Sequence, residues 1–345
     1  MRDPRRPIAI ATIGLTASVL VAAARAQTTD RGPRALLRTL ANISDAEWQA
    51  IDRGEAVAKI LDTDSREIAV VGAIRIAASA AVLVDRYRDI DRLKRSSIVL
   101  DVGRFSRPPV AGDLARVQFD DYSVDLRACQ PSDCRVRLSA GDVARFHREI
   151  DWNDPSWRQR SSAIWRDVLA QHAAAYARAG RQALPVFVNK RDPLGVASEL
   201  SELVQQMAFT STYAPELHAY IREFAPPLPA GAEDVIYWSR EDFGIRPVFR
   251  LSHQVIFRSA STPTIAVATN QIYADHYLDA ALTVTLAIDA GTADSRAFYL
   301  VSVSRARTRS LTGLLRTFVR STVQSRSREA LRKILTATRA GMERE

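Results

Sequence analysis

Two of the five histidines, His253 and His276, fall within strands that the C-terminal part of the sequence predicts. An unusually polar stretch, residues 270–279, surrounds the second one and lies between apolar runs at 265–268 and 280–288. Polar groups on a strand face that lines a cavity need hydrogen-bond partners or a ligand. The sequence therefore predicts a ligand-binding surface, and its candidate residues are His253, Asn270, Tyr273, His276 and Asp279.

Two other interpretations of these residues remain open. As an enzyme, the protein would use His276 as a general base oriented by Asp279 or Asp275. With neither role, His276 would be hydrogen-bonded within the sheet or lie in a bulge between two strands. The sequence holds no Gly-x-Ser-x-Gly elbow, no His-Glu-x-x-His helix, no phosphate loop and no histidine pair with metal-ligand spacing. It predicts no metal and no cofactor, and it leaves catalytic residues unknown.

The C-terminal segment is strongly basic. From Arg305 onward it holds eleven Arg and Lys residues against three Glu residues, and its apolar residues recur at helical spacing over 309–340. One interpretation is docking on an anionic membrane surface or an acidic partner. The other is the solvated outer face of a packed helix. The residues that would make the contact are Arg316, Arg320, Arg326, Arg332 and Lys333.

The first 26 residues have the pattern of an export signal. Three arginines precede an apolar run, which ends in Ala24-Arg25-Ala26, a small-x-small cleavage pattern. We expect cleavage near Ala26 and a periplasmic or secreted protein. The alternative is a retained membrane anchor, for which the apolar run is short.

The composition indicates a globular protein. The 345 residues are 47% hydrophobic and 25% charged, with a formal net charge of +9. This excess of positive charge is too small to require a nucleic-acid partner, so none is expected.

The two cysteines, Cys129 and Cys134, flank the turn-forming residues Gln-Pro-Ser-Asp. In an oxidising compartment this pattern favours a disulfide that closes the turn. A zinc site would need more ligands, and a redox pair usually has two intervening residues. We therefore expect a structural disulfide within a hairpin.

The remaining patterns predict an ordered set of elements. A capping box at Ser44 predicts a short helix ending at Gly54. Strands are expected at 56–61, 67–76, 98–102, 116–119, 135–138, 235–238, 248–258, 264–277, 280–289 and 298–304. Helices are expected from Ser79, from the capping signature Ser139–Asp142 to about Ile150, from Asp154-Pro155 to Gly180, and at 199–209 and 215–224. Residues 27–33 are polar and are expected to be frayed. Residues 225–231 are rich in proline and are expected to form a linker.

This order of elements resembles the helix-grip fold of START-like and polyketide-cyclase-like proteins. Residues 68–91 look like the family's early strand and the helix after it, which here runs from Ala77 through Tyr87 to Asp91. The resemblance covers residues 55–105 and 235–340, and it implies a curved antiparallel sheet around a long C-terminal helix, with an apolar cavity between them. Residues 140–225 have no counterpart in that fold.

The chain also resembles an uncharacterised exported bacterial family. The shared features are Trp48 with Arg53-Gly-Glu55, the segment from Arg127 to Leu138, Tyr237-Trp-Ser239, and residues 271–277. This resemblance implies no particular activity.

These observations together predict an α+β fold of helix-grip type with a helical insertion. The expected parts are a signal peptide (1–26), an N-terminal segment (27–54), the first part of the grip domain (55–139), the insertion (140–230) and the second part (231–345). The function we expect is non-enzymatic binding of an apolar or amphipathic small molecule, such as a lipid, between the sheet and the last helix. The alternatives are an enzyme of the same fold and an envelope interaction protein that acts through the basic helix.

Overall fold

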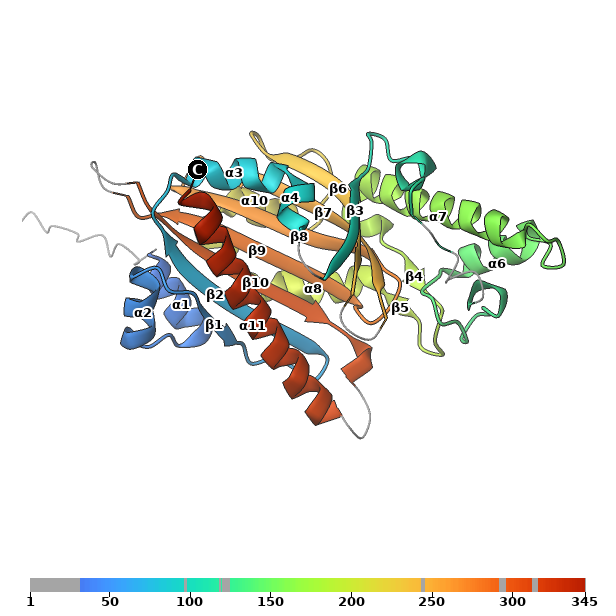
Figure 1. Ribbon diagram of the computed structural model, residues 1–345, viewed down its shortest axis with the longest axis horizontal. Helices are drawn as coiled ribbons and strands as arrows, with labels where there is room; N and C mark the ends of the chain where they lie inside the picture. The colour runs from blue at the N-terminus through green and yellow to red at the C-terminus, as the bar shows by residue number, and fades with distance from the viewer. Residues whose placement is uncertain are drawn as a thin grey trace, which may run out of the picture. The chain divides into compact units, whose positions relative to one another are not determined.

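An open, eight-stranded antiparallel sheet organises the computed structural model (Figure 1). The structure describes residues 32–95, 98–117, 119, 125–242, 246–291, 296–311 and 316–344. The strand order is β1-β2-β10-β9-β8-β7-β6-β3. The strands are β1 (Val57–Ile60), β2 (Glu67–Ile76), β3 (Val99–Arg104), β6 (Glu233–Glu241), β7 (Val248–Arg258), β8 (Thr264–Ala274), β9 (Ala280–Asp289) and β10 (Phe298–Arg307).

The long C-terminal helix α11 (Arg316–Met342) lies along β2 on one face of the sheet (Figure 1). Leu331 and Leu335 of α11 belong to the same apolar cluster as Val70 and Ile74 of β2. The helix α3 (Ala80–Arg88), which Ser79 caps, packs into this cluster through Leu83 and Val84, and α4 (Ile90–Lys94) follows it. The expected α+β class, with a curved antiparallel sheet against a long C-terminal helix, is confirmed.

Close packing of α11 on β2 requires a glycine at position 72. A Cβ atom added to Gly72 would lie 2.8 Å from Leu335 and 2.9 Å from Leu331. We expect Gly72→Ala to lower the free energy of unfolding by about 1–3 kcal/mol, because α11 must shift or its leucines must change rotamer. Chemical denaturation measures this loss. The control is Gly112→Ala, whose added Cβ would have no neighbour nearer than 3.9 Å; equal losses in the two variants would contradict the prediction.

A layer of helices covers the opposite face of the sheet. These helices come from the chain between β3 and β6, which are themselves neighbours in the sheet, so the expected helical insertion is present. They are α6 (Ala140–Glu149), α7 (Trp157–Ala179), α8 (Val196–Gln205), α9 (Thr210–Tyr213) and α10 (Pro215–Ile221), with a small hairpin of β4 (Val186–Phe187) and β5 (Leu194–Gly195). Trp165 of α7 is fully buried in the resulting core.

Two short helices precede the sheet. In α2 (Asp45–Asp52), Ser44 and Glu47 form the expected capping box. The helix α1 (Pro33–Ala41), which buries Leu36 and Leu37, was not predicted. It begins at the last residue of the segment, 27–33, that was expected to be polar and frayed. The predicted signal peptide lies outside the described residues. Within the described part of the chain, none of the helices combines the length and the apolarity needed to cross a bilayer.

The structure corrects several expected boundaries. Residues 135–138 are not a strand, and neither are the described residues among 116–119. The long insertion helix begins at Trp157, because Asp154 accepts hydrogen bonds from Ser156 in a turn ahead of it. The strand expected at 264–277 ends at Ala274. The helix expected at 309–340 is a short 3-10 turn (Arg309–Leu311) followed by α11.

Cys129 and Cys134 form the expected disulfide. They close a turn in which Gln130 pairs with Asp133, rather than a hairpin between two regular strands. Backbone amides of Ser132 and Cys134 donate to the carbonyls of Val188 and Asn189. These bonds join the cysteine turn to the β4–β5 region and explain why the segment does not form its own strand pair.

Candidate functional site

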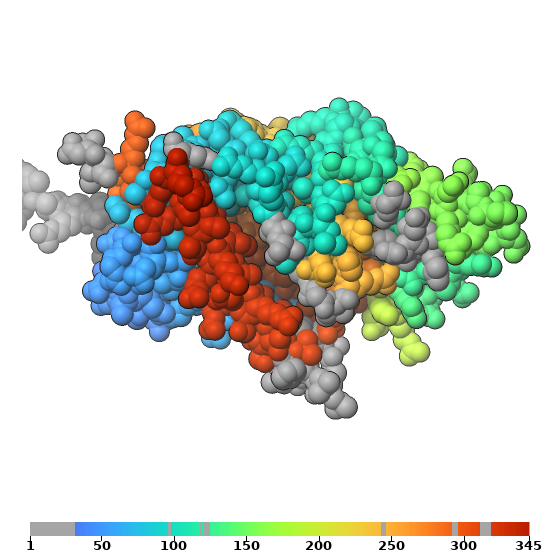
Figure 2. All heavy atoms as spheres, in the orientation of Figure 1, coloured from blue at the N-terminus to red at the C-terminus, as the bar shows by residue number. Residues whose placement is uncertain are grey.

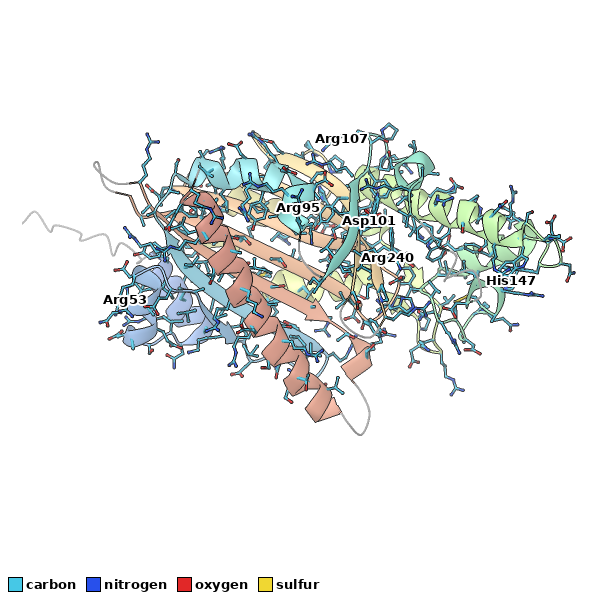
Figure 3. All side chains as sticks on the ribbon, viewed as in Figure 1. Arg53, Arg95, Asp101, Arg107, His147 and Arg240 are labelled. Carbon is cyan, nitrogen blue, oxygen red and sulfur yellow. A yellow bond between two sulfur atoms is a disulfide. The ribbon has the colours of Figure 1, made fainter. Side chains whose placement is uncertain are left out.

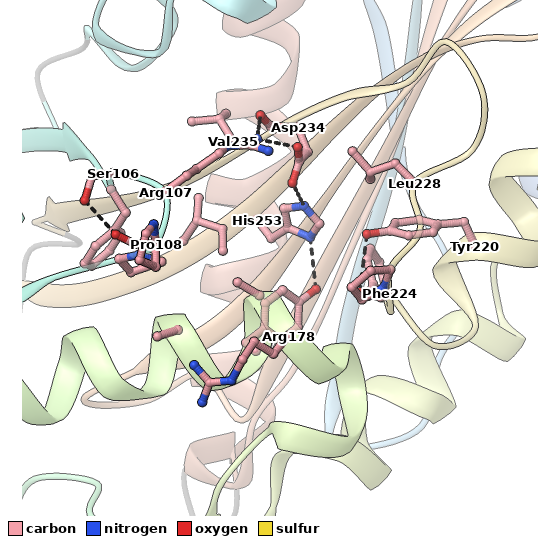
Figure 4. Close-up of a pocket in the computed structure, with 17 residues that line it drawn as sticks. Ser106, Arg107, Pro108, Arg178, Tyr220, Phe224, Leu228, Asp234, Val235 and His253 are labelled. Atoms are coloured by element: carbon pink, nitrogen blue, oxygen red, sulfur yellow. Dashed lines mark hydrogen bonds and ion pairs between the residues drawn. The ribbon is translucent and has the colours of Figure 1, made fainter.

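A pocket of about 390 Å³ lies on the insertion side of the sheet, opposite α11 (Figure 4). Its walls come from α7, from the loop after β3, from the segment that joins α10 to β6, and from β6 and β7. Most of the lining is apolar, including Phe105, Pro108, Tyr220, Phe224 and Leu228. Ligand pockets typically combine such walls with a few polar groups.

The polar corner of this pocket is a hydrogen-bonded series centred on His253. The Nε2 atom of His253 lies 3.0 Å from Oδ2 of Asp234, and its Nδ1 atom lies 3.1 Å from the Tyr176 hydroxyl (Figure 4). Asn270 donates from Nδ2 to the same hydroxyl at 3.1 Å. The structure thus brings together two of the predicted site residues, His253 and Asn270, through Tyr176 of the insertion.

The chemistry of these partners assigns the proton on His253. A carboxylate only accepts hydrogen bonds, so in the neutral imidazole Nε2 donates to Asp234 and Nδ1 is left as the acceptor for Tyr176. Burial alone would raise the pKa of Asp234, but hydrogen bonds from His253 and Arg107 outweigh it and hold that pKa below its usual value. Burial raises the pKa of Tyr176 well above its usual value, which keeps this hydroxyl a donor. Both ring nitrogens of His253 are therefore occupied.

Arg107 ties the loop after β3 to this corner. It donates to both the carbonyl and the carboxylate of Asp234 and lies near the edge of the sheet made by β3 and β6 (Figure 3). The Asp234 carboxylate therefore accepts hydrogen bonds from His253 on β7 and from Arg107 in the loop after β3. Its side chain remains 16% exposed, so a ligand that enters the pocket can reach it.

Tyr273 and Asp279, also predicted for the site, lie around a different residue, Arg137. Tyr273 donates its hydroxyl to the Arg137 carbonyl at 3.0 Å, and the Arg137 guanidinium contacts Asp279 at 2.5 Å. The Asp279 side chain is 1% exposed and the Arg137 side chain 8%. These contacts join the segment after the disulfide to the β8–β9 turn. Neither Tyr273 nor Asp279 lines the pocket near His253.

The prediction that His276 lies within a strand is wrong. It lies in the turn between β8 and β9, where Tyr277 has a left-handed backbone with φ of 53°. Residues 275–279 therefore do not continue the strand β8. Of the two aspartates considered as its partners, Asp275 contacts Nδ1 of His276 at 2.8 Å, whereas Asp279 is paired with Arg137. The Asp275 carboxylate also accepts the backbone N–H of Phe249, which fixes the turn to β7.

The residues predicted for the basic helix differ in their surroundings. Arg320 donates to Thr63 and to the Asp64 carbonyl, so it holds α11 to the loop before β2. Arg326 is exposed. Arg332 and Lys333 are 58% and 75% exposed and lie within 3.9 Å of Glu329. Arg316 begins the helix, and its side chain lies outside the described set.

Sequence reasoning missed Tyr176, Asp234 and Arg107, which complete the polar corner. Tyr176 lies within the helix predicted from Asp154-Pro155 to Gly180, and Asp234 adjoins a strand that was predicted to start at 235. The only available signal was the pair of proline-rich segments at 108–109 and 226–229. Three of these prolines, Pro108, Pro109 and Pro226, line the pocket.

Metal coordination and similarity to known proteins give no further assignment. Among the described residues, no group of three or more His, Cys, Asp or Glu side chains is placed to hold a metal ion. No family model matches the chain, and no curated protein matches it.

Proposed function

We propose that this protein is an exported, non-enzymatic binding protein that holds an amphipathic small molecule in the pocket beside His253. The observation that carries the proposal is the combination of mainly apolar walls with one charged corner, in a pocket of about 390 Å³. An apolar body would lie against Phe105, Phe224 and Leu228. A hydroxyl or amine of the ligand would donate to the Asp234 carboxylate, whose oxygens keep unused lone pairs.

The site differs from the cavity implied by the helix-grip resemblance, which lies between the sheet and the last helix. At β2, α11 packs directly against the sheet through Leu331 and Leu335, and the pocket shown in Figure 4 lies on the opposite face. The sheet against α11 still supports a kinship with START-like proteins as part of this proposal. The disulfide supports export, because disulfides persist in oxidising compartments.

Binding is favoured over catalysis by the hydrogen bonds of His253. A general base that acts on a ligand must lie within hydrogen-bond reach of the ligand proton that it abstracts. In this structure one ring nitrogen donates to Asp234 and the other accepts from Tyr176. The group that faces the ligand is then a carboxylate held ionised by His253 and Arg107, which suits recognition of a hydrogen-bond donor.

Filling the pocket tests the proposal. Ala177 lines it from the exposed side of α7, so Ala177→Trp should occupy the space without disturbing the buried core. We expect the affinity for N-phenyl-1-naphthylamine, a fluorescent and uncharged probe whose amine can donate to Asp234, to fall by about tenfold or more. Native mass spectrometry of the purified protein should show an organic-extractable mass bound to the natural sequence and not to this variant.

The matched control is Ala163→Trp, on an exposed position of the same helix that does not line the pocket. This variant should bind the probe like the unchanged protein. Equal probe binding by all three proteins, together with a ligand-free mass for each, would overturn the proposed function.

A further inference from the structure

The outer surface of α11 carries a row of exposed apolar side chains. Val319 is 40% exposed, Val323 37% and Ile334 60%. Positions 319, 323, 330, 334 and 337 recur at intervals of four, seven, four and three residues, which place them on one side of a helix. From Val319 to Ile334 the row extends about 22 Å at ~1.5 Å per residue. Figure 2 shows α11 lying on the surface of this face.

Cations lie directly beside this row. Arg326 and Lys333 are seven residues apart, so they form a second row next to the apolar one. Both are exposed, and the carboxylate nearest to Lys333 is Glu329 at 3.9 Å. By contrast, two other arginines of α11 contact the body of the protein: Arg320 donates to Thr63, and Arg339 donates to the Gly54 carbonyl.

We propose that the outer face of α11 docks on an anionic lipid bilayer, with the helix lying in the plane of the membrane surface. An exposed apolar row flanked by lysine and arginine is the arrangement that binds such interfaces. The apolar side chains would enter the boundary between headgroups and acyl chains, and the two cations would contact lipid phosphates. A second copy of this chain is a poor occupant, because it would bring the same cations against each other.

This inference is independent of the pocket beside His253, which lies on the other face of the sheet. Its test is co-sedimentation of the full protein with two kinds of vesicle. One is made of phosphatidylcholine alone, and in the other phosphatidylglycerol makes up one third of the lipid. We expect binding to the anionic vesicles, weakening as salt rises. The double variant R326E/K333E should lower the partition coefficient by about 30-fold or more, since each cation near an anionic surface contributes about fivefold. Replacing Val323 and Ile334 with serine should weaken binding while keeping its salt dependence.

The charge-matched control is R191E/R258E, in which two exposed arginines outside α11 are reversed. It should bind anionic vesicles within about twofold of the unchanged protein. The inference is overturned by failure to sediment with anionic vesicles, by equal binding to both compositions, or by an equal loss in the control, which would indicate net charge alone. A vesicle-free dimer that the serine variant abolishes would also overturn it, because the apolar row would then belong to a second copy.

Discussion

Replacing Arg137 with methionine is expected to lower the free energy of unfolding by about 3 kcal/mol. Methionine keeps an apolar stem of similar length and removes the guanidinium, which contacts the Asp279 carboxylate and the Leu278 carbonyl. Asp279 is 1% exposed; its remaining cationic neighbours, Arg66 and Arg309, are 3.9 and 4.0 Å away. The variant therefore takes the nearest cation away from a buried carboxylate. Urea denaturation at neutral pH measures the loss.

The loss should depend on pH. Burial already raises the pKa of Asp279, although Arg137 opposes this. Without Arg137 that pKa rises further, and a carboxyl with a raised pKa in the folded state favours folding at low pH and opposes it once ionised. The stability deficit of the variant should therefore shrink as the pH is lowered. Adding Asp279→Asn to the variant should recover part of the loss at neutral pH.

Arg135→Met is the matched control, because this arginine is two residues away and its side chain is 82% exposed. We expect a change of less than about 0.5 kcal/mol there. Similar losses at positions 135 and 137, or a deficit at position 137 that does not vary with pH, would show that the Arg137–Asp279 contact does not hold the cysteine segment on the β8–β9 turn.

The fold was predictable wherever residues follow a regular period or a local capping rule. The run from Glu67 to Ile76 is rich in β-branched residues, and it forms β2 with the expected bounds. Ser44, Ser79 and Ser139 each accept a hydrogen bond from the helix that follows. Such signals depend only on residues that are close together in the sequence, so they hold whatever tertiary contacts the chain makes.

The site was only partly predictable, because its contacts join distant parts of the chain. His253 was chosen as a polar residue within an apolar strand, and its burial and location on β7 agree with that choice. Its partner Tyr176 is 77 residues away on the insertion helix, and no spacing rule relates the two. The error at His276 has a similar cause: a polar stretch of this kind also fits a turn when tertiary hydrogen bonds hold it in place. Here these are the bonds between Asp275 and the backbone of Phe249 in β7.

A cluster of charged side chains surrounds Glu241 at the end of β6. Glu241 accepts hydrogen bonds from Ser239 at 2.8 Å and from Arg250 at 3.0 Å, and Lys94 lies 3.5 Å away. The Glu241 side chain is 5% exposed. Burial by itself would raise the pKa of Glu241, but the two cations and the hydrogen bonds outweigh it and lower that pKa to about 2. Two cations share this one carboxylate, so its charge is essential to their burial.

Glu241→Gln is expected to lower the free energy of unfolding at neutral pH by about 3 kcal/mol. The variant leaves the Lys94 and Arg250 side chains, which are 25% and 16% exposed, without their shared countercharge. The effect should fade in acid. A carboxyl whose pKa is depressed in the folded state stabilises the protein above its unfolded pKa, and this contribution is lost as the pH falls toward the folded value. From about pH 5 to about pH 3, the unchanged protein should therefore lose about 2 kcal/mol more stability than the variant.

Denaturation curves across that range test this, with Glu55→Gln as an exposed control. Parallel pH profiles for the unchanged protein and Glu241→Gln would contradict the assignment, since a carboxylate held ionised by Lys94 and Arg250 must contribute to the slope.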